Sequence, residues 1–332
     1  MNETVLVTGA AGFFGHHLVG YLLDNTDYDV IGLVRSGNVG TLERLHEVLA
    51  GRTDSDRVRL VWHDLSSPIP DHVFALIRHC KFVIHAGAET HVDRSIANPV
   101  PFVVSNVLGT VHLLQAVRQF DALQRFVQVS TDEVYGPAAT GQYFKEGDRY
   151  NATNPYAATK AGAEQLVNAF RATYGVPSLT LNLMNLFGER QHREKFIPKT
   201  IRYVLDGRPL PIHTVPGTGV PASRTYLHCR AAASALLYLL RDPVSPQKVN
   251  VPGYLEVSNL DLARSIAATV GYPLLMYETT TDDARPGHDP RYALDGSVLD
   301  SVGWKRPPEY DFWPTLRTVV WWTLHNRRWL MG

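Results

Sequence analysis

Short apolar runs alternate with helical patterns through the first half of the chain, and this alternation restricts its fold more than any other feature. Five runs have the length and composition of buried strands: TVLVTG, DVIGLV, VRLVWHD, FVIHAG and RFVQVST. Between them, apolar residues recur at helical spacing in HHLVGYLLD, TLERLHEVLA, HVFALIRH and NVLGTVHLLQAVRQF. Strands that alternate with helices form right-handed crossovers and a parallel sheet covered on both faces. The sequence therefore predicts a Rossmann-type, doubly wound α/β fold.

The second half of the chain has a different character. A helix predicted from Pro155 to about Tyr174 is followed by the apolar segment SLTLNLMNLFG, which we interpret as a sixth strand. Beyond Gly188, proline and glycine become frequent, and short strands mix with helical patterns such as RAAASALLYLLRD and NLDLARSIAATVG. We expect approximately residues 1–188 to form the sheet domain. Residues 189–332 would form mainly a smaller α/β substrate-binding lobe, with the chain crossing back to the first domain.

Composition excludes several classes of protein. The 332 residues carry 32 acidic and 32 basic side chains, so bulk charge favours neither nucleic acid nor a membrane surface as a partner. The cysteines, Cys80 and Cys229, show no metal-ligand spacing and indicate a reducing compartment. The N-terminus lacks a basic leader, and no run of about 18 apolar residues predicts a membrane span. We expect a soluble, cytoplasmic protein that binds no metal.

The C-terminal segment TVVWWTLHNRRWL is amphipathic and contains two arginines. Such a helix can lie on a membrane surface. We expect it instead to pack its tryptophans on the core of the protein.

A glycine-rich turn, Gly9-Ala-Ala-Gly12-Phe-Phe-Gly15, follows the first predicted strand and opens the first predicted helix. In this context the three glycines allow a tight turn, close approach to phosphate and close helix–strand packing. The helix N-terminus then offers free N–H groups to an anion. The motif predicts a site for the pyrophosphate of NAD or NADP, with Gly9, Gly12, Phe13, Phe14 and Gly15 as its residues.

The identity of the cofactor depends on the end of the second strand. An acid that binds the adenosine ribose is expected about 20 residues after the turn, but Val34 occupies that position. Arg35 and Ser36 could hold a 2′-phosphate, which favours NADP, whereas a surface arginine beside an NAD site is the alternative. Asp64 is placed to contact the adenine edge. The remaining predicted cofactor contacts are Leu65 and Ala86.

Two adjacent acids follow the apolar run FVQV in the stretch Ser130-Thr131-Asp132-Glu133-Val134-Tyr135-Gly136. Neighbouring side chains on a strand point to opposite faces. Asp132 and Glu133 can therefore share a cleft only if the strand has ended, which the following Gly-Pro indicates. A solvated acidic loop is the alternative interpretation.

Tyr156 and Lys160, in NPYAATK, lie four residues apart at the start of a helix and therefore on one face. A lysine ammonium near the phenol, with a positive nicotinamide ring close by, favours the phenolate. Tyr156 is thus a candidate base near neutral pH.

Together these motifs resemble those of the extended short-chain dehydrogenases/reductases of the NAD-dependent epimerase/dehydratase family, most closely the dTDP-glucose 4,6-dehydratases. The resemblance covers nearly the whole chain through VTGAAGFFG, HAGAETHVDRS, NVLGT, VSTDEVYG, NPYAATKA, NLFG, EKFIP, RPGHDPRYALD and VGWKRP. Most of these motifs are common to the superfamily. The Thr-Asp-Glu triplet, together with EKFIP and RPGHDPRYALD, is narrower.

The resemblance implies a reaction and roles for five residues. A 4,6-dehydratase oxidises the sugar at C4, removes water across C5–C6 and returns the hydride to C6. By similarity, Asp132 is the general acid and Glu133 the base, which suits two carboxyl groups held in different protonation states. Thr131 would hydrogen-bond the C4 oxygen. Tyr156 would take the C4 hydroxyl proton, and Lys160 would hold the ribose and lower the pKa of the tyrosine.

The resemblance also implies a nucleotide-diphosphate sugar as substrate and a cofactor that stays bound and is recycled. Asn185, Arg224 and Arg285 would bind the diphosphate, for which bidentate arginines are suited. Other residues that the family pattern places at the substrate or over the cofactor are Glu89, His91, Asp93, Arg94, Glu194, Lys195 and His288. The helices that carry NVLGT and Tyr156 have broad apolar faces, which in this family pair across a homodimer.

Some features depart from the pattern, and other functions compete. The family usually has aspartate at the position of Val34 and an acidic segment where this chain has Tyr226-Leu-His-Cys-Arg-Ala231, and the stretch ERQHR is unusually charged. A nucleotide-sugar 4-epimerase or a UDP-glucuronate decarboxylase would share the fold, but neither needs an acid at Asp132. A nucleotide-sensing scaffold of the superfamily usually lacks the tyrosine or the lysine. The base and sugar of the substrate are left open.

Overall fold

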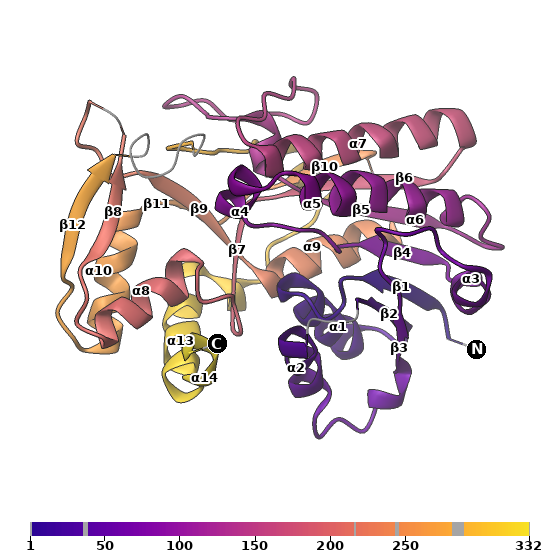
Figure 1. Cartoon of the computed structure of the whole chain (residues 1–332), viewed down its shortest axis with the longest axis horizontal. Coiled ribbons are helices and arrows are strands. Elements are labelled where there is room, and N and C mark those ends of the chain that lie inside the picture. Colours follow the sequence, from indigo (N-terminus) through magenta and orange to yellow (C-terminus); the bar gives the residue numbers. More distant parts are fainter. Residues whose placement is uncertain (1, 36–38, 216, 243–245, 281–288, 332) are drawn as a thin grey trace.

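A seven-stranded sheet forms the centre of the computed structural model, which describes residues 2–35, 39–215, 217–242, 246–280 and 289–331 (Figure 1). Its strand order is β10-β6-β5-β4-β1-β2-β3, and every neighbouring pair is parallel. The strands are β1 (Thr4–Thr8), β2 (Asp29–Val34), β3 (Val58–Trp62), β4 (Phe82–His85), β5 (Arg125–Thr131), β6 (Ser178–Leu183) and β10 (Lys248–Val251). The predicted Rossmann-type fold is confirmed.

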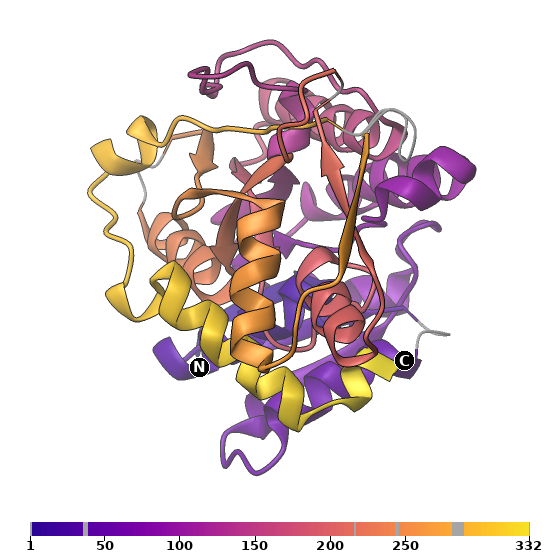
Figure 2. The ribbon, with the colours of Figure 1, turned by 90° about the vertical axis from the view of Figure 1, so that its left-hand side faces the viewer.

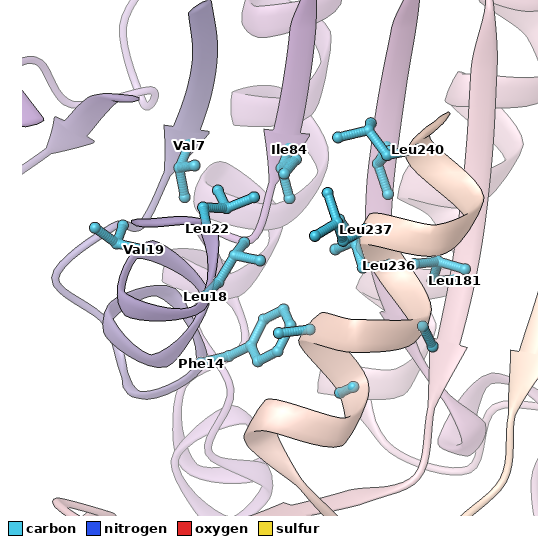
Figure 3. Packing of buried hydrophobic residues seen from close by; sticks show 14 of the residues in the cluster. Val7, Phe14, Leu18, Val19, Leu22, Ile84, Leu181, Leu236, Leu237 and Leu240 are labelled. Atoms are coloured by element: carbon cyan, nitrogen blue, oxygen red, sulfur yellow. The ribbon is translucent and has the colours of Figure 1, made fainter. Parts of the chain in front are cut away.

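The two faces of the sheet bury alternate residues of its strands. Val5 and Val7 of β1 lie in one apolar cluster, whereas Leu6 lies in the cluster on the opposite face. The first cluster is covered by α1 (Phe13–Asn25), α2 (Val39–Leu49) and α9 (Cys229–Arg241), and Figure 3 shows leucines of α1 and α9 reaching toward Ile84 of β4. The second is covered by α3 (Asp71–Ile77), α6 (Gly109–Val117) and α7 (Pro155–Tyr174).

The predicted sixth strand is wrong in its extent. SLTLNLMNLFG contains two strands in two different sheets, because β6 ends at Leu183 and β7 (Asn185–Phe187) joins a three-stranded sheet of order β11-β9-β7. The other members of that sheet are β9 (Ser223–His228) and β11 (Glu256–Ser258). A continuous apolar run does not record the point at which the chain leaves one sheet for another, so the sequence could not show this break.

The second lobe packs helices around its own apolar cluster. Figure 2 shows these helices with the orange α10 in the foreground. Its helices are α8 (Phe196–Leu205), α10 (Asn259–Val270), α13 (Phe312–His325) and α14 (Arg328–Met331). A parallel pair, β8 (Leu210–Thr214) and β12 (Met276–Thr280), lies beside them. The short helices α12 (Ser297–Ser301) and η4 (Pro308–Tyr310) precede α13.

The chain returns to the sheet domain after the second lobe has begun. Helix α9 packs on α1, and β10 extends the main sheet beside β6. The boundary near residue 188 remains a proposal. It does not separate the two lobes completely, because α9 and β10 lie after it in the sequence and belong to the sheet domain.

The C-terminal helix packs on the core, but not through all of its tryptophans. Phe312, Leu316 and Val320 of α13 are buried in the cluster of the second lobe. Trp321, by contrast, is 61% exposed. The amphipathic pattern predicted the packing of the helix correctly and the burial of Trp321 wrongly.

One helical segment, Val100–Val117, is long and apolar enough to cross a membrane by length and composition alone. It comprises α5 (Val100–Phe102), the π-helical segment η2 (Val103–Leu108) and α6, preceded by α4 (Val92–Ala97). Residues Leu113, Leu114 and Val117 of this segment pack on the sheet in the second cluster. It thus contributes one side to the core of the protein.

Candidate active site

A cleft of about 510 Å³ opens at the carboxyl ends of the parallel strands, between the two lobes. Ligands of open α/β sheets bind at this edge, and the volume suits an organic ligand of substantial size. The sheet domain contributes the glycine-rich turn, Ala86 and the acidic triplet, together with Tyr156 and Lys160. The lining residues of the second lobe include Asn185, Glu194, Lys195, Arg224 and Tyr292.

The glycine-rich turn is built as its sequence predicts. Gly9 has φ +66°, and a Cβ atom there would lie 2.7 Å from the Cα of Gly87. A Cβ at Gly15 would lie only 2.0 Å from the carbonyl oxygen of Gly9. Helix α1 begins at Phe13, and no side chain of the described residues caps its first turn. The free N–H groups and the cradle without side chains fit the pyrophosphate of a dinucleotide.

The predicted adenosine contacts lie together outside the cleft lining. Arg35, at the end of β2, donates to Glu89 Oε1 at 2.9 Å, and its Nε lies 4.0 Å from Asp64 Oδ2. The carbonyl of Leu65 accepts a hydrogen bond from His112 at 2.8 Å. Ser36 lies outside the described residues. Arg35 is thus paired with two carboxylates. A 2′-phosphate bound to Arg35 would have to replace them or bind despite their negative charge.

Strand β5 ends at Thr131, and the short helix η3 (Asp132–Tyr135) follows it directly. The Thr131 hydroxyl accepts from the backbone N–H of Glu133 at 3.3 Å and donates to Asp132 Oδ1 at 2.9 Å. This turn allows both acids to line one cleft, which strand geometry would have prevented. Asp132 is only 3% exposed. The alternative of a solvated acidic loop is therefore wrong.

The two carboxyl groups have different surroundings. Burial and the neighbouring Glu133 raise the pKa of Asp132 to about 7, and its Oδ2 has no hydrogen-bond partner in the described chain. Burial also raises the pKa of Glu133, while a hydrogen bond from Asn154 and the charges of Lys195 and Arg224 oppose that rise. The pKa of both acids is thus raised, and donors that favour the ionised form lie beside Glu133.

Tyr156 and Lys160 reach the same cleft from the first turns of α7. Burial raises the pKa of the Tyr156 phenol, and a hydrogen bond with Thr131 partly opposes this rise. Burial lowers the pKa of Lys160 to about 8, and its Nζ donates to the carbonyl of Val129 at 2.6 Å. Formation of the phenolate would therefore require positive charge beyond what the protein supplies here, and a nicotinamide ring is the candidate.

Arg224 lies in the cleft but also has a structural task. Its buried guanidinium donates to the carbonyls of Asp289 and Pro290, both at 2.6 Å, and lies 4.9 Å from the ring centroid of Tyr292. It thus holds the segment that carries Tyr292. Arg285 and His288, the other residues predicted from RPGHDPRYALD, lie outside the described residues.

Glu194 joins the two lobes across the mouth of the cleft. Its Oε2 accepts from Arg94 at 3.0 Å and lies 2.9 Å from His91 Nε2, both residues of the α4 region. His192, in the charged stretch ERQHR, lies 3.7 Å from the same oxygen. Asp93 is exposed on α4 and does not line the cleft, whereas Lys195 and Asn185 do.

Comparison with known proteins agrees with this geometry. The model of the NAD dependent epimerase/dehydratase family matches residues 5–251. The low-salt glycan biosynthesis protein Agl12 of Haloferax volcanii is 39% identical over 95% of this chain and 97% of its own length. A dTDP-glucose 4,6-dehydratase of Escherichia coli is 33% identical over 98% of this chain and 94% of its own. This chain belongs to the NAD-dependent epimerase/dehydratase family.

Solved structures of the family have the same architecture. DesIV, a dTDP-glucose 4,6-dehydratase from Streptomyces venezuelae with NAD and TYD bound, superposes with a TM-score of 0.85 at 31% identity, covering 98% of each chain. A UDP-N-acetylglucosamine 4-epimerase from Methanobrevibacter ruminantium M1 gives a TM-score of 0.84 at 25% identity, covering 98% of this chain and 99% of its own. Fold similarity alone therefore does not separate dehydratases from epimerases within the family.

Two residues that contact Glu133 were not among the predicted site residues. Asn154 Nδ2 donates to Glu133 Oε2 at 3.2 Å, and the Tyr292 hydroxyl donates to the same oxygen at 3.5 Å. Both lie within motifs that were recognised, NPYAATK and RPGHDPRYALD. The sequence could not show their role, because the contact depends on how distant segments fold together.

The unusual segment Tyr226–Ala231 forms part of a buried cluster near the glycine-rich turn. His228 Nε2 and His17 Nε2 lie 3.8 and 3.9 Å from Glu189 Oε2, and the ring of Phe13 packs on the edge of His17. Glu189 and His228, which lie in the two segments that differ from the family pattern, thus pack against each other beside α1.

Proposed function

We propose that the protein is a nucleotide-sugar 4,6-dehydratase, which converts an NDP-hexose to an NDP-4-keto-6-deoxyhexose. The observation that carries this proposal is the pair of a buried Asp132 and a half-buried Glu133, which line one cleft beside Tyr156 with different hydrogen-bond partners. An elimination needs a base for the C5 proton and an acid for the C6 hydroxyl, and this pair offers both.

Each residue has a role in this reaction. Tyr156 takes the proton of the C4 hydroxyl, with Thr131 bonded to the C4 oxygen and Lys160 placed for the cofactor ribose. The new C4 ketone acidifies C5, whose proton Glu133 removes. Asp132 gives its proton to the departing C6 hydroxyl, which leaves as water. Bound NAD would supply reversible hydride acceptance, from C4 first and back to C6 at the end, so that it would remain bound between cycles. As C6 accepts the hydride, Glu133 returns a proton, which exchanges with solvent, to C5.

The substrate would lie between the lobes, with Asn185, Lys195 and Arg224 toward its diphosphate. His91 and Glu89 would lie over the cofactor and the sugar. Arg285 and His288, by family pattern, would complete the nucleotide site. These assignments follow the resemblance and the position of the described residues around the cleft.

Arg35 is the residue that we propose to decide between NAD and NADP. Val34 leaves the ribose hydroxyl without an acid on β2, and Arg35 could meet a 2′-phosphate in its place. The carboxylates of Glu89 and Asp64 beside Arg35 work against this, because they would repel a phosphate. The preference for NADP that the sequence suggested is therefore weakened.

We propose a cytoplasmic homodimer that pairs through Val100–Val117 and α7. Val100, Val103 and Leu108 are 64%, 48% and 41% exposed on this segment, and an apolar surface of this kind marks an interface. The buried free thiols of Cys80 and Cys229 are compatible with a reducing compartment.

A nucleotide-sugar 4-epimerase is the second candidate, because such enzymes share this fold. It has no use for a protonated acid at Asp132. A UDP-glucuronate decarboxylase is disfavoured for the same reason, and a nucleotide-sensing scaffold would not need Tyr156 and Lys160 in one cleft.

Incubation of the purified protein with dTDP-, UDP-, GDP- and CDP-glucose, UDP-N-acetylglucosamine and GDP-mannose in heavy water tests the proposal. We expect one of them to lose water and to gain deuterium at C5, as measured by mass spectrometry and proton NMR. Inversion at C4 without a change in formula would instead identify an epimerase.

A further inference from the structure

Asn154 contacts both Glu133 and the first turn of the helix that carries Tyr156. Its Oδ1 accepts the backbone N–H of Ala157 at 2.9 Å, which caps the helix that carries Tyr156. Its Nδ2 donates to Glu133 Oε2 at 3.2 Å. The residue is 5% exposed. One buried amide therefore links the base for C5 to the helix turn that presents the base for the C4 hydroxyl.

The cap fixes which side of the amide faces Glu133. A side-chain amide has one oxygen acceptor and one NH₂ donor, on opposite sides of a planar group. Because the N–H of Ala157 requires the oxygen, the NH₂ must point toward the carboxylate. A donor that cannot accept a proton favours the ionised form of Glu133.

The two donors to the Glu133 carboxylate that the described part of the chain provides bind the same oxygen. The Tyr292 hydroxyl reaches Oε2 at 3.5 Å, the oxygen that Asn154 also reaches. Among the described residues, both side-chain hydrogen bonds to this carboxylate therefore use Oε2, which leaves Oε1 as the oxygen that we assign to the substrate proton. Glu133 lines the cleft in this orientation.

The second lobe supports this arrangement. Thr153, the residue before Asn154, donates to Asp289 Oδ2 at 2.7 Å, and Arg224 holds the carbonyl of Asp289 at 2.6 Å. Asn154 is therefore fixed from the helix on one side and from the second lobe on the other. Buried supports of this kind limit the rotamers of the group that they hold.

We infer that Asn154 is a positioning residue, which directs Glu133 at the C5 proton and keeps it in register with Tyr156. The inference rests on the proposed dehydratase function. C4 and C5 are adjacent atoms, so the two bases must keep a fixed separation through oxidation and elimination. Misplacement by about 1 Å can cost about 100-fold in rate.

Three variants separate this role from helix capping. Asn154→Ser and Asn154→Asp keep a good N-cap, whereas Asn154→Ala removes it. Only the wild type offers Glu133 an N–H donor, because serine has no amide group and a shorter side chain, and aspartate presents a second carboxylate. A residue that served only as a cap would tolerate serine and suffer from alanine.

The experiment compares the variants with the wild type, using the sugar nucleotide that the wild type dehydrates best. For each protein we would measure kcat, KM, the pH profile of kcat, the absorbance of reduced nicotinamide and thermal unfolding. For Asn154→Ser we expect kcat to fall about 10- to 100-fold, with KM within about twofold and an unchanged melting temperature. The acidic limb of the profile should move to higher pH, because Glu133 loses a donor to its ionised form. Reduced nicotinamide should accumulate, since elimination is slowed and C4 oxidation is not. Asn154→Asp should be slower still.

The inference would be overturned if Asn154→Ser had the same kcat and pH profile as the wild type. It would also be overturned if the substitution slowed oxidation and elimination equally. Either result leaves the proposed function intact, because the wild type still dehydrates its substrate. A wild type that binds sugar nucleotides but releases no dehydrated product would contradict the proposed function itself, and the inference would be rejected with it.

Discussion

Asp132 shows how the site departs from what stability alone would favour. A carboxyl group that is 3% exposed, with one oxygen lacking a partner among the described residues, opposes folding when it ionises. The same burial raises the pKa of Asp132 to about 7, which suits the proposed donation of its proton to the C6 hydroxyl. Costs of this kind are concentrated at functional sites.

Asp132→Asn should therefore inactivate the protein and stabilise it. Loss of the general acid should lower the dehydration rate by about 10²–10⁴-fold. The folded protein binds this proton more tightly than the unfolded chain, so wild-type stability falls as pH rises from about 4 to about 7. The amide cannot ionise, and at pH 8 the free energy of unfolding should rise by up to about 4 kcal/mol. Urea unfolding at pH 8 and pH 4 measures this, and a variant less stable than the wild type at pH 8 would contradict it.

The raised pKa of Asp132 also leads us to predict the alkaline limb of the pH–rate profile. As pH rises through about 7, Asp132 loses the proton that it must donate, and kcat should decline. The decline should be absent from substrate binding, measured by calorimetry over the same range. A kcat that stays constant to pH 9 would show that Asp132 is not the acid.

At the scale of elements, the strands that are buried on both faces could be predicted from sequence. Each is a short apolar run, and β1 to β5 occur where such runs lie. The division of SLTLNLMNLFG and the placement of β10 in the main sheet could not be predicted, because both depend on pairing with distant strands. The Thr-Asp-Glu triplet could be predicted because its three residues are adjacent in the sequence. Asn154 and Tyr292 were missed since their contacts with Glu133 are tertiary.

The turn between β1 and α1 gives a prediction at this scale. In Gly15→Ala the new methyl group would meet the carbonyl oxygen of Gly9 at 2.0 Å, so the turn must open. We expect loss of bound cofactor, measured by absorbance, and a fall of about 1–3 kcal/mol in the free energy of unfolding. The matched control is Gly147→Ala, whose methyl group meets no atom within 4 Å. Retention of cofactor by Gly15→Ala would contradict the assignment of this turn.

At the scale of the whole molecule, the site needs both lobes. Glu133 and Tyr156 come from the sheet domain, whereas Tyr292 and Arg224 come from segments of the second lobe. Ion pairs of Glu194 with Arg94 and His91 cross between them. The residues to which we assign the chemistry could therefore be named from the sequence, while the residues that support them required the folded chain.

The proposed homodimer gives a prediction for the assembled protein. Val103→Glu places a charge on the exposed apolar segment and should shift the protein from dimer to monomer in light scattering at micromolar concentration. Val220→Glu is the matched control, because Val220 is 57% exposed on the second lobe. The circular dichroism of both variants should match the wild type. A monomeric wild type, or a dimeric Val103→Glu, would contradict the proposed interface.

In the proposed reaction, one site oxidises C4, eliminates water and returns the same hydride to C6. This reaction is tested most directly with the accepted sugar nucleotide carrying deuterium at C4, turned over in ordinary water and examined by NMR. We predict that the deuterium is found at C6 of a 4-keto-6-deoxy product, with a solvent proton at C5. Deuterium that remains at C4 of an inverted sugar, or that is lost to solvent, would contradict the proposed internal hydride transfer.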